Sequence, residues 1–394
     1  DIGKGMRTGS YVISQVTSHI HRETLNRHVS KYNGNYKVKQ FGCRQQFIAM
    51  AFAQLTFRHG LRDIVECMNA QPEALHHLGF KGPLAKSTLA DANESRDWRI
   101  WQGVAMSLIR KARKLYAGEE LAVDLDHTVY ALDSSTVDLS LTLFPWATFR
   151  KTKAGIKMHT QIDLRGAIPT CIHVTDARQH DINWLDSLTY EPGAIYLADR
   201  AYLDFHRLAR LHKSHGFFVL RSKDNTVVNR QSSRPVNKAN GLRSDQTVLL
   251  GRRESREAFR WPLRRVTYRD PEDGHFYEFL TNLMSQPAAN IPELYRMRWQ
   301  IELFFRWVKG HLEIRHFYGN SSNAVKTQVW ISVIVYLIVA ILHKELKLQG
   351  TLHRTFQILS ICPFSQTPIH ELLMRSDFRT FHMPNFKQLE FNDL

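Results

Sequence analysis

The chain has few cysteines, and their spacing excludes two common uses of this residue. Four are present among 394 residues, at Cys43, Cys67, Cys171 and Cys362, and no two of them form a C-x-x-C motif. Such wide spacing argues against a zinc ribbon and against a disulfide scaffold. We therefore expect buried thiols in a reducing compartment.

The sequence also lacks the segments that mark a secreted or membrane protein. No long apolar run that would suit a signal peptide lies near the beginning of the chain, and we expect the natural start near Met6. The apolar run Val329–Leu342 is bounded by Lys326 and Lys344, and it is too short to cross a bilayer comfortably. We expect this run to form a core helix.

No internal repeat, low-complexity tract or H-E-x-x-H zinc motif is visible, although the chain has 20 histidines. Positive charge is in excess, because 53 Lys and Arg residues outnumber 37 Asp and Glu residues and give a formal net charge of +16. This excess points to a polyanionic partner, and nucleic acid is the first candidate. The length and a hydrophobic content of 43% suit a globular protein of two or three domains.

The first third of the chain has the apolar spacing of helices. Between about residues 40 and 116, segments such as FIAMAFAQL and LRDIVECMN are separated by glycine and proline. Short helices joined by tight turns are typical of helix-turn-helix modules. A plain helical packing domain is the alternative.

From Leu121 onward the pattern changes to short strands, which predicts an α/β core. Polar, basic residues from 224 to 246 are typical of a loop, and the strands that follow them predict a β-rich insertion. The core then resumes with a helix at 292–310 and the apolar helix at 323–346. The strands expected in the core lie at 129–133, 157–164, 167–174, 194–199 and 217–222, with a helix at 202–216.

Two acids end apolar strands of this core, Asp133 in YALDSST and Asp199 in YLADRAY. The carboxyl ends of neighbouring strands in an open α/β sheet converge on one crevice, so these side chains are expected to be neighbours. For a single strand-ending aspartate, a turn or helix cap is the alternative role. The acids that compete with these two are Asp124, Asp126, Asp138 and Asp204.

A third carboxylate lies in the segment YRMRWQIELFFRWVK. On one continuous helix, Tyr295, Arg298, Glu302 and Lys309 would fall within an arc of about 60°. Three carboxylates with few other ligands suit Mg²⁺ or Mn²⁺, and two such ions about 4 Å apart can promote an in-line displacement at a phosphodiester. The alternative is an amphipathic surface helix with an Arg298–Glu302 pair.

These segments, LDSST, LADRAY and Y-x₂-R-x₃-E-x₆-K, resemble the three signature regions of the insertion-sequence-4 family of DDE transposases, and the resemblance covers about residues 20–345. It implies an α/β fold with a ribonuclease-H-like catalytic core and a β-rich insertion at about 224–288. An all-helical N-terminal DNA-binding domain would precede this core. The implied divisions are 1–118, 119–350 and a C-terminal tail at 351–394.

The same resemblance implies the roles of the site residues. Asp133, Asp199 and Glu302 would be catalytic and would hold Mg²⁺ or Mn²⁺, as two ions. Tyr295, Arg298 and Lys309 would hold phosphates of the DNA. Further DNA contacts are expected from Arg200, which could instead pair with an acid, and from Trp299 and, less directly, Trp261, either of which could stack on a flipped base or belong to a core.

The implied activity is cut-and-paste transposition in a bacterial cytoplasm, at the nucleoid when bound to DNA. The partners would be the terminal inverted repeats of the element and target DNA, both double-stranded, with a homodimer forming on DNA. Lys157, His159 and the basic stretch Arg252–Arg265 are further residues that could face DNA. A nuclease of the same fold and a DNA-binding protein without catalysis are the alternative functions.

Overall fold

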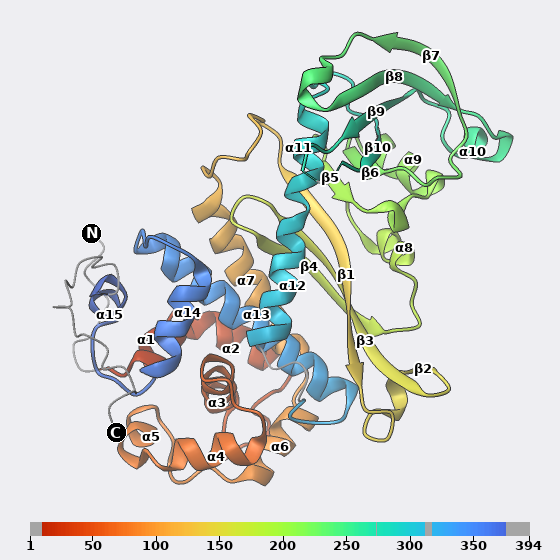
Figure 1. Cartoon of the computed structure of the whole chain (residues 1–394). Helices are drawn as coiled ribbons and strands as arrows, with labels where there is room; N and C mark the ends of the chain where they lie inside the picture. Colours follow the sequence, from red (N-terminus) through yellow and green to blue (C-terminus); the bar gives the residue numbers. More distant parts are fainter. Residues whose placement is uncertain (1–9, 273, 312–316, 376–394) are drawn as a thin grey trace, which may run out of the picture.

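The computed structural model describes residues 10–272, 274–311 and 317–375, and it has a helical lobe beside a large β-sheet (Figure 1). The lobe starts with a run of helices, as the apolar spacing predicts. They are α1 (Val12–Thr17), α2 (Arg22–Lys31), α3 (Cys43–Leu55), α4 (Leu61–Asn69), α5 (Pro72–His77), α6 (Lys86–Ser95) and α7 (Arg99–Tyr116).

Helix α13 (Ser322–Glu345) forms the centre of this lobe. All residues from Thr327 to Leu342 are buried, and the helix packs against α3, α6 and α7. Its length and composition alone would suit a membrane span, but 94% of its most apolar window is buried inside the protein. A helix that is apolar on all sides needs protein around it, and the prediction of a core helix is confirmed.

The last described helices, α14 (Leu352–Ile361) and α15 (Ile369–Arg375), return to the beginning of the chain. The backbone N–H groups of Val12 and Ile13 donate to the carbonyls of Ser365 (2.8 Å) and Pro363 (2.9 Å). Part of the expected C-terminal tail therefore packs against α1. The division of the chain at 118 and 350 stays a prediction.

The central sheet has the strand order β4–β3–β1–β5–β6. Strand β3 is antiparallel to β1 and β4, whereas β5 and β6 run parallel to β1. This order and these directions are those of a ribonuclease-H-like core, so the predicted fold class is confirmed. The strands are β1 (Val129–Leu139), β3 (Lys153–Asp163), β4 (Ile168–Asp176), β5 (Ile195–Ala198) and β6 (Phe217–Arg221), and a short β2 (Thr148–Arg150) pairs with β3.

Alternate residues of β1 face two separate cores, as expected for a strand covered on both sides. Val129 and Ala131 belong to the core that includes α12 (Trp299–His311) and α13. Tyr130 and Leu132 belong to the core that includes α8 (Asp181–Trp184) and α9 (Phe205–Lys213). This alternation decides on which side of the sheet each later residue of β1 lies.

The β-rich insertion extends the same sheet in the order β6–β10–β9–β8–β7 (Figure 1). Its elements are β7 (Val228–Arg234), β8 (Leu242–Leu250), α10 (Arg253–Ala258), β9 (Leu263–Arg269) and β10 (Phe276–Thr281). The prediction of a loop over 224–246 was wrong for two parts of this range, because residues 228–234 form β7 and residues from 242 onward belong to β8. Beyond Val228, the side chains of β7 are all exposed, so this edge strand has no apolar alternation to reveal it.

A buried ion pair stabilises the insertion. Arg264 on β9 binds Asp245 on β8 with two contacts of 2.8 Å, and both side chains are 3% exposed. Arg264 also donates to the carbonyl of Gln286 (2.5 Å), beyond the end of β10. Removing one partner of such a pair leaves an uncompensated buried charge.

We therefore expect Asp245→Ala to lower the free energy of unfolding by about 3–5 kcal/mol, measured by urea denaturation. The control is Glu257→Ala, since Glu257 pairs with Arg253 at 2.9 Å on the surface, where the two side chains are 65% and 91% exposed. This change should have little effect on unfolding. Equal stabilities of the two variants would contradict the role of the Arg264 pair.

Candidate active site

Asp133 and Asp199 lie on the same face of the sheet, at matching positions of neighbouring parallel strands. The pairing of β1 with β5 runs from Val129↔Ile195 to Ala131↔Leu197. Each aspartate therefore follows the last paired residue of its strand by two positions. Because side chains alternate, both aspartates face the side that α12 covers.

The two aspartates are held differently. Asp199 directly follows β5, as predicted, and its carboxylate accepts from the N–H of Ala201 (2.7 Å) at the start of η3 (Arg200–Tyr202). The prediction that Asp133 ends a strand and starts a turn was wrong, because β1 continues to Leu139 in antiparallel pairing with β3. Asp133 is thus fixed within a strand.

The prediction that Glu302 lies on one continuous helix with Tyr295 and Arg298 was wrong, because the segment forms two helices. Helix α11 (Asn290–Met297) ends at Arg298, and α12 begins at Trp299. The N–H of Arg298 donates to Tyr295 O (3.1 Å) and that of Ile301 donates to Arg298 O (3.1 Å), which are the i→i+3 bonds of a tighter turn. In Figure 1 the two helices run nearly end to end between the insertion and the helical lobe.

This joint places Arg298 between two of the predicted metal ligands. Its Nη2 lies 2.6 Å from Glu302 Oε1, and its Nη1 lies 3.4 Å from Asp133 Oδ2. The guanidinium carbon lies 5.5 Å from the ring centre of Tyr295. The Arg298 side chain is only 15% exposed, so its charge is directed at these groups and away from solvent.

Burial and neighbouring acids make Asp133 hard to ionise. Burial is the largest cause that raises its pKa to about 6, and the negative charges of Asp199 and Glu302 raise it further. The N–H of Ser134 and the charge of Arg298 oppose this rise. The pKa of the Tyr295 hydroxyl is also raised, first by burial and then by the charge of Asp199. These effects show that the three acids and Tyr295 share one electrostatic environment.

Carboxylate oxygens are the donors that Mg²⁺ and Mn²⁺ prefer, and Asp133, Asp199 and Glu302 offer them. Within residues 10–272, 274–311 and 317–375, no three His, Cys, Asp or Glu side chains are close enough together to hold a metal ion. Arg298 lies in contact with both Asp133 and Glu302. The donor chemistry therefore fits a divalent cation, and in this structure the charge of Asp133 and Glu302 is balanced by Arg298.

The raised pKa of Asp133 predicts a dependence of stability on pH in metal-free buffer. Its pKa in the folded chain, about 6, lies above the ordinary value of 3.8. The folded chain therefore holds this proton more tightly than the unfolded chain does. This contribution to the free energy of unfolding is fully present below about pH 4 and is lost as the pH rises through about 6. Asp133→Asn cannot ionise, so at pH 8 it should be more stable than the parent by about 3 kcal/mol, since one pKa unit corresponds to about 1.4 kcal/mol.

Unfolding by urea at pH 4 and pH 8 measures this effect. The advantage of Asp133→Asn should disappear at pH 4, where both side chains are neutral. A parent chain that is the more stable of the two at pH 8 would show that Arg298 outweighs burial.

Asp199 lines a small cleft of about 530 Å³, whose charged lining residues are two acids and two bases. Arg200 lines it and lies 3.8 Å from Asp224, an exposed acid that is not one of the predicted metal ligands. The role of Arg200 stays a prediction. Lys223 also lines the cleft and was missed in the sequence analysis. It follows β6, the next parallel strand after β5, so the rule that located Asp199 could also have located this lysine.

Trp299 and Lys309 lie on α12 on either side of Glu302. Trp299 is 50% exposed, and the guanidinium of Arg306 lies 5.8 Å from its ring centre. Lys309 is partly buried, about two turns beyond Glu302. An exposed indole beside a carboxylate site is available to stack on a base.

Three other single residues, Trp261, His159 and Lys157, are in contact with neighbouring side chains, and the basic stretch is only partly buried. Trp261 packs against His212, at 4.7 Å between ring centres, and against Phe259 at 5.3 Å. His159 is fully buried, and Lys157 pairs with Asp181 at 3.0 Å. The basic stretch Arg252–Arg265 divides between the short helix α10 and strand β9, and it includes the buried Arg264.

The amino-acid sequence of this chain is similar to those of several known proteins. Residues 8–81 match a domain of unknown function (DUF4372). A probable transposase for insertion sequence element IS5377 of Geobacillus stearothermophilus is 31% identical over 57% of this chain and 59% of its own length. The putative transposase y4zB of Sinorhizobium fredii is 32% identical over 60% of this chain and 67% of its own length.

A putative transposase for insertion sequence element IS4SA of Synechocystis is 24% identical over 65% of this chain and 71% of its own length. Among solved structures, the piggyBac transposase synaptic complex with hairpin DNA has a TM-score of 0.49 at 10% identity. That likeness covers 94% of this chain and 83% of the piggyBac chain.

Residues 124–338 match the family described as the transposase DDE domain. This range is more than half of the 394 residues, and it includes Asp133, Asp199 and Glu302. The chain belongs to the DDE transposase family.

Proposed function

We propose that this chain is the transposase of an insertion sequence of the insertion-sequence-4 family, which cuts the ends of its element and joins them to target DNA. One observation carries the proposal above others. Asp133 and Asp199 occupy matching positions on neighbouring strands, and Glu302 reaches the same face from α12 through its contact with Arg298. These contacts support a site to which three separate elements would each contribute one carboxylate, with Arg298 between Asp133 and Glu302.

Asp133, Asp199 and Glu302 would hold the divalent ions, Mg²⁺ or Mn²⁺, and two ions fit the three-carboxylate set. When bound, such ions make a water or a 3′ hydroxyl a better nucleophile and stabilise the leaving oxygen. Arg298, with its planar guanidinium, would turn from the carboxylates to a DNA phosphate. Tyr295 and Lys309 would hold neighbouring phosphates, and Trp299 would stack on an unpaired base.

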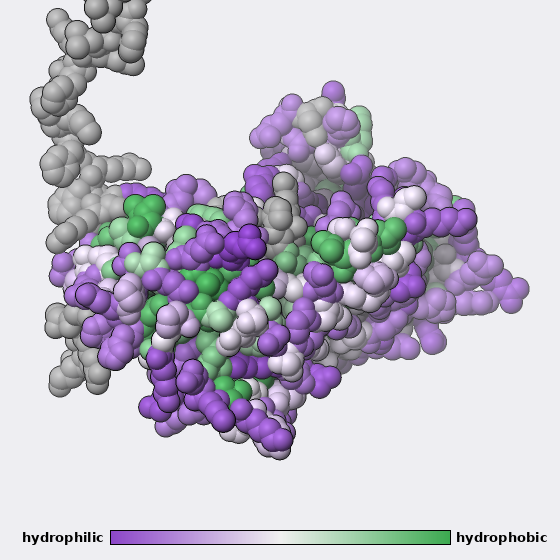
Figure 2. Space-filling model, turned by 90° about the horizontal axis from the view of Figure 1, so that it is seen from below, coloured by the Kyte–Doolittle hydropathy of each residue, from purple (hydrophilic) through white to green (hydrophobic). Residues whose placement is uncertain are grey.

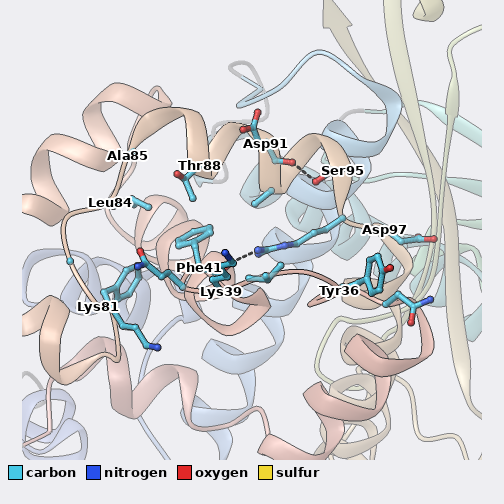
Figure 3. A pocket seen from close by; sticks show the side chains of 18 of the residues that line it. Tyr36, Lys39, Phe41, Lys81, Leu84, Ala85, Thr88, Asp91, Ser95 and Asp97 are labelled. Atoms are coloured by element: carbon cyan, nitrogen blue, oxygen red, sulfur yellow. Dashed lines mark hydrogen bonds between the residues drawn. The ribbon is translucent and has the colours of Figure 1, made fainter.

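We further propose that the helical lobe binds the element end. A groove of about 880 Å³ lies between the loop 32–41, the loop 80–85 and one face of α6. Figure 3 shows Tyr36 at one end of this groove and Lys81 near the other, with Thr88 and Ser95 on α6. Tyr36 is 70% exposed, and Lys39 and Lys81 add positive charge to the lining.

The surface of the lobe suits a hydrated, charged partner. Figure 2 shows mostly hydrophilic residues on one face of the molecule, with hydrophobic residues gathered in small areas between them. The net charge of +16 would attract the DNA backbone. Two element ends need two sites, so we propose a homodimer on DNA, in the cytoplasm of a bacterium.

The test is cleavage of a labelled DNA end taken from the sequence that flanks the gene, with Mg²⁺ and with EDTA. The proposal predicts a cut at the element end that EDTA removes, followed by a joined product when target DNA is added. A cut that is never followed by joining would favour a nuclease of the same fold. Binding without cleavage in Mg²⁺ or Mn²⁺ would favour a DNA-binding protein and contradict catalysis.

A further inference from the structure

A second charged cluster lies behind Asp133, on the opposite face of the sheet. It consists of Ser134, Lys157, His159 and Asp181, and none of them belongs to the carboxylate site described above. Ser134 is paired with His159 across β1 and β3, and Thr136 with Lys157, so these side chains share the face that α8 covers. Asp181 is the first residue of α8.

Asp181 is held by three side chains from β1 and β3. Its Oδ1 accepts from Ser134 Oγ at 2.5 Å, lies 3.0 Å from Lys157 Nζ and lies 3.7 Å from His159 Nδ1. Lys157 also donates to the carbonyl of Gln179 at 3.0 Å. A carboxylate with this many partners has a fixed position.

The partners of Asp181 are themselves enclosed. The His159 side chain is fully buried and that of Lys157 is 14% exposed. The His159 ring is stacked on Trp184 of α8 at 5.8 Å between ring centres. Burial and these contacts restrict the cluster to one arrangement. The fixed carboxylate of Asp181 therefore holds the Ser134 hydroxyl in one place.

Ser134 connects this cluster to the metal-ligand candidate in front of it. While its hydroxyl is bound by Asp181, its backbone N–H donates to Asp133 Oδ1 at 2.8 Å. The second oxygen of Asp133, Oδ2, is the one that faces Arg298. Ser134 therefore orients one carboxylate oxygen and leaves the other directed at the site.

We propose that Asp181 is a positioning residue for Asp133 and acts through Ser134. This inference rests on the proposed function, since it assigns Asp181 to the support of one metal ligand. Partners behind a ligand typically change metal affinity or activity about 10- to 100-fold. Beyond Ala131 the pairing of β1 with β5 ends, and β1 is held there by β3, the strand that also carries Lys157 and His159.

The test measures Mn²⁺ binding to the full chain without DNA, by the loss of the free Mn²⁺ signal in electron paramagnetic resonance. Ser134→Ala removes the link and should weaken Mn²⁺ binding about tenfold, and Ser134→Thr, which keeps the hydroxyl, should restore it. Asp181→Ala should weaken binding to a similar extent. The double variant should be no weaker than the weaker single variant, because both changes break one path.

The matched control is Asp176→Ala. Asp176 is the last residue of β4, five residues before Asp181, and its side chain pairs with Arg178 at 3.4 Å. Its loss should leave Mn²⁺ affinity unchanged. The inference would be overturned if Ser134→Ala bound Mn²⁺ with the parental affinity. It would also be overturned if the losses of affinity in the two single variants added up in the double variant. A lower melting temperature in any of these variants would not change either conclusion. A parent chain that binds no Mn²⁺ would instead contradict the metal site of the proposed function, and the positioning role with it.

Discussion

Glu302→Gln is expected to slow cleavage of the element end by about a thousandfold or more. A bound metal ion supplies several kcal/mol of transition-state stabilisation, and each 1.4 kcal/mol is about tenfold in rate. Glutamine has the same shape and keeps an oxygen that can accept from Arg298, which lies 2.6 Å from Glu302. The change should therefore remove the negative charge that is proposed to attract the metal, and it should leave the fold intact. Single-turnover cleavage with Mg²⁺ measures it.

The control for this experiment is Glu293→Gln on α11. Glu293 is 45% exposed and pairs with Arg296 at 3.2 Å, so its charge should be irrelevant to cleavage. Affinity for the element end, measured by gel shift, should be unchanged in both variants. If Glu302→Gln cuts DNA at the parental rate, Glu302 is not a metal ligand.

Asp199 shows how well the sequence predicts the position of a residue in the fold when local chemistry decides. Its strand is a short apolar run, and the acid comes directly after it and caps the next turn. Periodicity, the direction of parallel strands and the strand-end rule were sufficient to locate it. The buried helix α13 was predicted for the same reason, because an apolar run of that length has few alternatives.

Arg298 shows what the sequence could not reveal. Helical spacing predicted that Tyr295, Arg298 and Glu302 lie on one side of a single helix. The sequence around Arg298 has no signal that a helix ends there. The tighter turn there depends on how α11 and α12 pack against the sheet. That packing is a tertiary effect, which local propensity does not encode.

Asp181 was missed because its role depends on contacts across the sheet. It lies 47 residues after Ser134, and its other partners come from β3. No spacing rule connects an acid at the start of a four-residue helix to a strand so far away in the chain. The topology of the sheet had to be known before these residues could be seen together.

Arg298→Ala is expected to destabilise the metal-free chain at pH 8 by about 3 kcal/mol, the cost of breaking a buried ion pair. Arg298 holds the pKa of Asp133 down against burial, Asp199 and Glu302. Without it that pKa rises above about 6, and ionisation of Asp133 costs more folding free energy as the pH increases. The destabilisation should therefore be smaller at pH 4, where Asp133 is neutral in both chains.

The same variant should respond more strongly to metal than the parent. We expect Arg298 and a divalent cation to neutralise the same carboxylates. Without Arg298, the cation alone would neutralise their negative charge. Mn²⁺ should then raise the melting temperature of Arg298→Ala more than that of the parent, because a ligand stabilises the state that binds it. Cleavage should nevertheless fall if Arg298 also holds a DNA phosphate, as proposed above.

Arg306→Ala is the matched control for Arg298→Ala. Arg306 lies on α12, about two turns beyond Arg298, and it is exposed, with its guanidinium 5.8 Å from the ring centre of Trp299. Its removal should change neither the dependence of stability on pH nor the response to Mn²⁺. If Arg298→Ala behaves like Arg306→Ala, the arginine does not balance the charge of the carboxylates. If Arg298→Ala is destabilised at pH 8 and Mn²⁺ restores it, arginine and metal are alternative occupants of one site, and DNA binding would have to exchange them.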